Sequence, residues 1–142
     1  MKIPIIFSGP ENPAHQDINS YSAERFFSSV EGLMPSELRT LAGDTVRAVA
    51  TGCDAAGAKD VSHVKAYIEY ASGFLHADTV SGSGGISVAG RDGEKAQRFR
   101  LVINAVIYGL PEASIKMATE QALETVRVQY GLNQELPSGK QY

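Results

Sequence analysis

The stretch QRFRLVINAVIY, residues Gln97 to Tyr108, decides the fold that this sequence predicts. Its residues alternate between two sets, which is the pattern of a β-strand with one buried face. One set is an unbroken apolar row, made of Phe99, Leu101, Ile103, Ala105 and Ile107. The other set contains Arg98, Arg100, Val102 and Asn104. The stretch therefore predicts a sheet with one face on a core and a polar face opposite.

Two earlier segments extend the predicted sheet. Val61–Ala71 alternates in the same way, with Val64, Ala66, Ile68 and Tyr70 on one side and His63, Lys65, Tyr67 and Glu69 on the other. Thr45–Thr51 has the composition of a strand, and Gly52–Lys59, with its two glycines, has that of a turn. We therefore expect the two segments to form an antiparallel hairpin.

The segment Ala77–Ala96 is rich in glycine and serine. This composition predicts a long flexible loop, although Ile86-Ser87-Val88 within it is also compatible with the end of a strand. Its glycines match neither the GxGxxG nor the GxxxxGK[ST] pattern, which argues against a nucleotide-binding loop.

A C-terminal helix is expected from Pro111 to Tyr130. Proline fits the first helical position, Glu112 complements the positive end of the helix, and Gly131 is a common stop. The apolar side of the sheet is the available cover for its stripe, which consists of Ile115, Ala118, Ala122, Leu123, Val126 and Tyr130. The tail, Leu132–Tyr142, is expected to be irregular.

The N-terminal third leaves alternatives open. Lys2–Ser8 is a candidate short strand, ended by a loop that contains two prolines. Within Ser20–Leu41, the apolar residues Phe26, Phe27, Val30 and Leu33 recur at helical spacing, whereas Phe26–Val30 by itself also fits a strand. A break is expected at Met34-Pro35-Ser36.

Length and composition predict one α+β domain over residues 1–142, mainly β to about residue 110, helical over 111–130 and irregular beyond. We expect neither a membrane span nor a secretion signal. The single cysteine, Cys53, cannot form an internal disulfide and predicts a reducing compartment. The histidines His15, His63 and His76 lack the spacing of metal ligands, so no metal and no cofactor is expected.

Catalytic motifs are missing from the sequence. No Ser/His/Asp or Cys/His arrangement has a recognisable spacing, and GxSxG is absent. A helix, a sheet and Cys53 loosely fit a peroxidase with paired reactive cysteines, but that chemistry requires a second thiol. We expect a protein that is not an enzyme.

Basic side chains gather on the polar side of the predicted strands. They are Arg47, Lys65, Arg98 and Arg100, with His63 beside them, and Glu69 is the single acid expected there. Cations spaced along a sheet neutralise successive phosphates, and Tyr67 and Tyr108 add surfaces on which bases stack. The alternative is a solvated face whose cations deter edge pairing. The net charge of −3 allows a basic face on an acidic body.

The order of a strand hairpin, a Gly-rich loop, a long strand and a helix, in a chain that ends in tyrosine, resembles the coat protein of single-stranded RNA bacteriophages of the levivirus type. The matching segments are Val46–Val49 with Val64–Ile68 for the central hairpin, Phe99–Tyr108 for the last strand and Pro111–Tyr130 for the helix. The resemblance covers about Thr45–Tyr142. The N-terminal third does not match the early strands of the family.

The resemblance implies a capsid protein and its partners. In that family two sheets join edge to edge in a dimer, each helix packs on the partner's sheet, and dimers close into an icosahedral shell around single-stranded genomic RNA. The implied partners are therefore further copies of the chain and RNA, without a membrane. The implied location is the virion, assembled in the cytoplasm of a bacterial host. Alternatives are a phage tail or connector subunit, or a small oligomeric enzyme.

The candidate RNA-binding residues are Arg47, Thr51, His63, Lys65, Tyr67, Arg98, Arg100 and Asn104. Arg98 and Arg100 stand where the family often has tyrosine and asparagine in contact with a specific RNA hairpin. We therefore expect genome packaging rather than sequence-specific repression.

Overall fold

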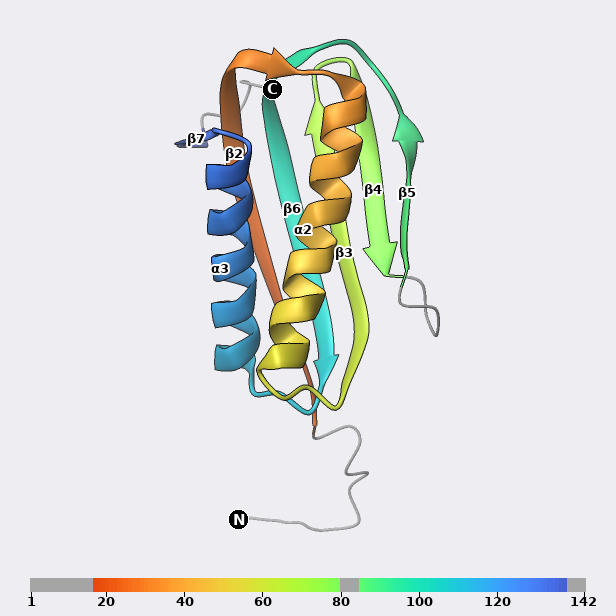
Figure 1. Cartoon of the computed structure of the whole chain (residues 1–142), viewed down its shortest axis with the longest axis vertical. Coiled ribbons are helices and arrows are strands. Elements are labelled where there is room, and N and C mark those ends of the chain that lie inside the picture. The colour runs from red at the N-terminus through yellow and green to blue at the C-terminus, as the bar shows by residue number, and fades with distance from the viewer. Residues whose placement is uncertain (1–16, 80–84, 138–142) are drawn as a thin grey trace.

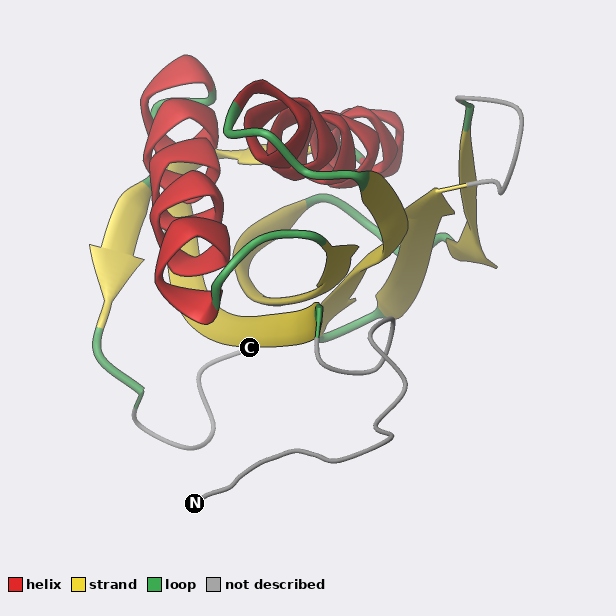
Figure 2. Cartoon of the chain, turned by 90° about the horizontal axis from the view of Figure 1, so that it is seen from below, coloured by secondary structure: helices red, strands yellow, loops and turns green. Residues whose placement is uncertain are grey.

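A computed structural model describes residues 17–79 and 85–137 of the chain. The predicted strand Lys2–Ser8 and the end of the tail lie outside these residues. The described part is an α+β fold in which two helices cover one face of a six-stranded antiparallel sheet (Figures 1 and 2). The expected class, an antiparallel sheet followed by a C-terminal helix, is confirmed.

The sheet has the strand order β5-β4-β3-β6-β2-β7. In chain order the elements are β2 (Ile18–Leu33), α2 (Pro35–Ala55), β3 (Asp60–Tyr70), β4 (Gly73–Thr79), β5 (Ile86–Arg91), β6 (Ala96–Tyr108), α3 (Glu112–Gln129) and β7 (Asn133–Glu135). The helix α2 links β2 to β3 with β6 between them, and α3 links β6 to β7 with β2 between them. The chain therefore contains two split β-α-β units, and the β4–β5 hairpin widens the sheet beyond β3.

The predicted strand Gln97–Tyr108 lies in the middle of the sheet as β6. Its apolar row, from Phe99 to Ile107, is buried under the two helices, as predicted. The stripe of α3 is also buried, except for the half-buried Tyr130, and it packs against α2 and β2 of its own chain. Packing of α3 on a partner's sheet stays a prediction.

The predicted strand Thr45–Thr51 is wrong, because these residues form part of α2. The residues Leu38, Leu41, Thr45, Val49 and Cys53 recur every three or four positions, and they are all buried together with Val46. This helical periodicity outweighs the β preference of threonine and valine. The hydroxyl of Thr45 donates to the carbonyl of Leu41 at 2.7 Å, which satisfies it within the helix.

Two consequences follow for the neighbouring predictions. The hairpin of Thr45–Thr51 with β3 does not exist, and the turn expected over Gly52–Lys59 is shorter, because α2 continues to Ala55. At the other end, the break at Met34-Pro35 is confirmed. Proline starts the helix, and the Glu37 carboxylate accepts a hydrogen bond from the Met34 amide at 2.8 Å.

The segment Ser20–Leu41, for which the sequence allowed a helix or a strand, contains a strand followed by the start of a helix. Phe26–Val30 belongs to β2, and Phe27 packs on Phe99 with ring centroids 5.8 Å apart. The flexible loop expected over Ala77–Ala96 is wrong for Ala77–Thr79, which belongs to β4, and for Ile86–Arg91, which forms β5. The suggested strand at Ile86–Val88 is confirmed within β5. A side chain at Gly90 would lie 2.2 Å from the Phe74 carbonyl oxygen, so glycine allows β5 to lie close to β4.

Candidate interaction surface

The sheet face opposite the helices is the candidate functional surface, and we call it the open face (Figure 2). Side chains alternate along each strand, so those that neighbour the buried rows of β3 and β6 point to this face. The strand registers then assign residues of the other strands to it. No element of the described chain covers it.

Six of the eight predicted site residues lie together on the open face. His63, Lys65 and Tyr67 come from β3, and Arg98, Arg100 and Asn104 come from the adjacent strand β6. Lys65 is the direct register partner of Asn104. The alternation recognised in the sequence was sufficient to place these side chains on a shared surface.

Arg47 and Thr51 do not belong to this surface. Both are exposed on α2, on the other side of the sheet, where they line a groove of about 590 Å³ between α2 and α3. Arg47 lies 3.8 Å from the Asp44 carboxylate. The prediction that they share one face with Lys65 failed because Thr45–Thr51 was assigned to a strand.

The expectation of a single acid on the open face is also wrong. Around the middle of β6, the open face holds four cations and four carboxylates. The cations are Lys65, Arg91, Arg98 and Arg100, and the carboxylates are Glu24, Glu69, Asp78 and Glu135. Three of those acids come from β2, β4 and β7, which were not recognised in the sequence as strands. This part of the face is therefore formally neutral.

Several of these charges are paired within the chain. The Arg100 guanidinium donates to Glu24 and, at 3.4 Å, to Glu69. Arg98 lies 3.7 Å from Glu135. Both arginines are therefore held by carboxylates of other strands, although exposed pairs of this kind contribute little to stability.

Aromatic side chains gather on the β3–β4 part of the open face. The rings of Tyr67 and His76 are 4.9 Å apart, those of Phe74 and His76 are 5.8 Å apart, and Arg91 lies over Phe74 at 5.8 Å. Phe26 of β2 and Val102 of β6 are half-buried on the same face. The open face thus combines partly exposed apolar side chains with balanced charge.

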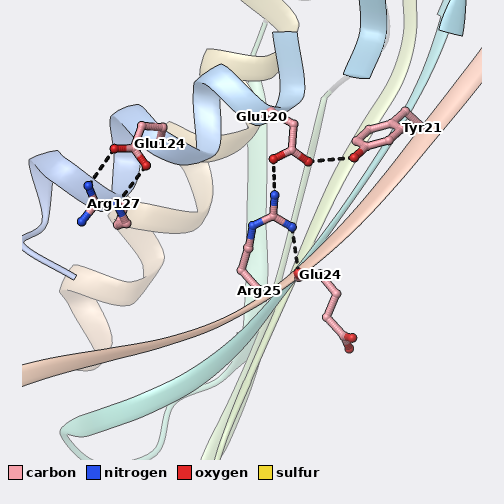
Figure 3. Close-up of polar contacts among 6 residues, drawn as sticks. All are labelled: Tyr21, Glu24, Arg25, Glu120, Glu124 and Arg127. Carbon is pink, nitrogen blue, oxygen red and sulfur yellow. Dashed lines mark hydrogen bonds and ion pairs between the residues drawn. The ribbon is translucent and has the colours of Figure 1, made fainter. Parts of the chain in front are cut away.

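The helix-covered side holds a different polar cluster, which fixes α3 to β2 (Figure 3). The Glu120 carboxylate accepts a hydrogen bond from Tyr21 at 2.7 Å and another from Arg25. Partial burial opposes ionisation of Glu120, but these two hydrogen bonds outweigh it and lower its pKa. The Glu24 side chain points away from this cluster, because neighbouring strand residues face opposite ways.

The described residues contain side chains of the types that bind metals, and one thiol, that of Cys53. No group of three or more His, Cys, Asp or Glu residues within 17–79 and 85–137 could hold a metal ion. Cys53 is buried in α2, and burial raises the pKa of its thiol, which leaves less of the reactive thiolate. Neither helix that the structure describes is long and apolar enough to cross a membrane.

Comparisons with known proteins gave no match. No family model matches the chain, and neither a curated protein nor a solved structure matches it. The open face is therefore the feature from which a function is inferred.

Sequence reasoning missed half of that face. Phe74, His76 and Asp78 alternate with Leu75 and Ala77 shortly after the turn at Ala71-Ser72, so the sequence does contain a period-two pattern for β4. Glu24 and Phe26 belong to a strand whose pattern was left ambiguous. Only Glu135 had no usable pattern, because β7 has three residues.

Proposed function

We propose that the chain is a structural subunit that assembles with copies of itself, and that this assembly is the coat of a single-stranded RNA bacteriophage. The observation that carries the proposal is the open face, which no helix or strand of residues 17–79 and 85–137 covers and which holds Phe26, Tyr67, Phe74 and Val102. Uncovered sheet surfaces with aromatic side chains are typical of protein interfaces.

Balanced charge favours a protein partner on this face. A nucleic-acid phosphate backbone binds best to a surface with a surplus of cations. On the open face, the four cations around the middle of β6 are offset by four carboxylates, those of Glu24, Glu69, Asp78 and Glu135. Charges of both signs suit a partner that also carries both signs. A second copy of the chain meets this requirement.

The coat assignment is supported by the part of the sequence pattern that the fold retains. The alternating strand β3, the long strand β6 and the C-terminal helix α3 occupy the expected ranges. In the levivirus type a helix covers the partner's sheet, whereas here α2 and α3 cover the apolar face of their own sheet. The association that we propose therefore uses the open face, and the protein acts in the virion rather than as an enzyme.

RNA binding on the same face is the second candidate function. Lys65, Arg98 and Arg100 lie on two adjacent strands beside Tyr67 and His63, which is a suitable set for phosphate contacts and base stacking. RNA would have to displace the carboxylates that hold the two arginines. Self-association and RNA binding therefore compete for one surface.

Electron microscopy and light scattering of the purified full chain test the proposal. We expect large closed particles, and an absorbance ratio at 260 and 280 nm that shows enclosed RNA. Rings or tubes without RNA would replace the coat assignment by a tail or connector subunit. A monodisperse monomer without nucleic acid would overturn the proposal.

A further inference from the structure

We infer that the open face is self-complementary, so that two copies pack face to face about a two-fold axis that runs parallel to the strands between β3 and β6. This inference rests on the proposed self-assembly and names the surface and the geometry of one contact. It is carried by the order of side chains across the sheet.

One row of side chains crosses the open face from edge to edge. Successive register pairs give its order as Arg91, Phe74, Glu69, Arg100, Phe26 and Glu135, one residue from each of the six strands. In chemical terms the row is cation, aromatic, anion, cation, aromatic, anion. It repeats the same triplet twice.

The proposed axis reverses the row of the partner. Arg91 then faces the partner's Glu135, Phe74 faces the partner's Phe26, and Glu69 faces the partner's Arg100. Each of these pairs occurs twice in the dimer because of the two-fold symmetry. All six positions therefore meet a complementary group.

The neighbouring row of side chains on the open face is also complementary to its reversed copy. Its order is His76, Tyr67, Val102 and Glu24. The same axis places His76 opposite the partner's Glu24, and Tyr67 opposite the partner's Val102. Face-to-face sheets pack roughly 10 Å apart with nearly aligned strands, which is the arrangement that an axis parallel to the strands produces.

Charges at the centre join into one network in this arrangement. Glu69 and Arg100 already lie 3.4 Å apart within each copy, next to Glu24. The axis passes between their strands and brings the two such pairs together. Desolvated charge pairs of this kind fix register and orientation more than they add affinity.

Mixed cross-linking tests the geometry directly. Arg91→Cys and Glu135→Cys variants are prepared separately, and buried Cys53 leaves each with one accessible thiol in the described fold. A bismaleimide that spans roughly 10 Å, the spacing of packed sheets, should link the mixture of the two variants but neither variant alone. Self-linking of either variant, or no linking in assembled protein, would overturn the inference.

Charge exchange provides a second test. Arg91→Glu should weaken self-association roughly tenfold or more, because each dimer then has two like-charge contacts with Glu135. The double variant Arg91→Glu with Glu135→Arg should recover it, since both signs are reversed together. The matched control is Arg47→Glu on α2, which makes the same charge change on the other side of the sheet.

The outcomes separate this inference from the proposed function. Assembly that is insensitive to Arg91→Glu would retain the structural role and overturn the face-to-face contact. Loss of RNA without a change in oligomeric state would assign the face to RNA instead. A monomeric wild-type protein would overturn both.

Discussion

The two faces of one sheet differ in almost every property, although the same strands build them. Along β6, Leu101 and Ile103 are fully buried under helices, whereas their neighbours Arg100, Val102 and Asn104 stay partly exposed on the open face. The covered face is apolar and closed within one chain. The comparison teaches that the two helices of the described chain bury one face of this sheet, whereas none of its described elements covers the other.

Truncation on the covered face should give the largest effect. Leu101→Ala removes a fully buried side chain next to Phe99, and we expect a loss of about 3 kcal/mol in the free energy of unfolding. Chemical denaturation of the purified protein measures it. Val102→Ala on the open face of the same strand is the matched control, and an equal loss there would contradict the contrast between the faces.

Removal of cations from the open face tests its second candidate function. If RNA occupies this face, Arg98→Ser combined with Arg100→Ser should lower RNA affinity about tenfold and reduce the salt slope by about two, because two phosphate contacts disappear. Filter binding over a range of salt concentrations measures both. Unchanged RNA binding would assign these arginines to protein contacts.

The Glu120 cluster should make the covered side sensitive to acid. The pKa of Glu120 is lowered in the folded protein, so its contribution is present above the pKa of about 4.3 that a glutamate has in unfolded chains. It is lost as the pH falls through the lower folded value. Glu120→Gln should therefore cost about 1 kcal/mol at neutral pH, and this cost should decrease as the pH falls below the ordinary pKa of a glutamate.

Thermal unfolding across this pH range tests the expectation. Glu31→Gln in the exposed end of β2 is the control, since Glu31 has no part in the cluster. A cost of Glu120→Gln that stays the same at pH 3 and pH 7 would show that the carboxylate charge does not hold α3 on β2.

The smallest effect is expected in Thr45–Thr51, the segment that was predicted as a strand but lies in α2. Thr51 is exposed on α2, so Thr51→Ala should raise stability by a few tenths of a kcal/mol, as expected for a helix position. On a strand the same change would lower stability. Denaturant midpoints of the two proteins distinguish these signs.

Sequence reasoning found the parts of the fold that have one clear period. β3, β6 and α3 were predicted with nearly correct ends, since alternation or a helical stripe continues over their whole length. α2 was missed because its β-branched half, Thr45–Thr51, was considered apart from Leu38 and Leu41, which complete the helical period.

The candidate surface was predicted only in part for a related reason. A strand pattern shows which side chains share a face, but the neighbours of that face depend on strand order, which is a tertiary property. The partners of Arg98 and Arg100 lie on β7 and β2, 37 and 76 positions away in the sequence. The cations were therefore visible in the sequence, whereas of the acids that pair with them only Glu69 was.

Gly90 has a consequence for the tolerance of this protein to substitution. Gly90 lies between Ala89 and Arg91 and has no side chain that could bind a partner. Any side chain at this position would clash with the carbonyl oxygen of Phe74. A replacement would push the outermost strand away and displace Arg91 with it. The width of the open face thus depends on the absence of a side chain at Gly90, and this uncharged position should tolerate less substitution than Arg91 beside it.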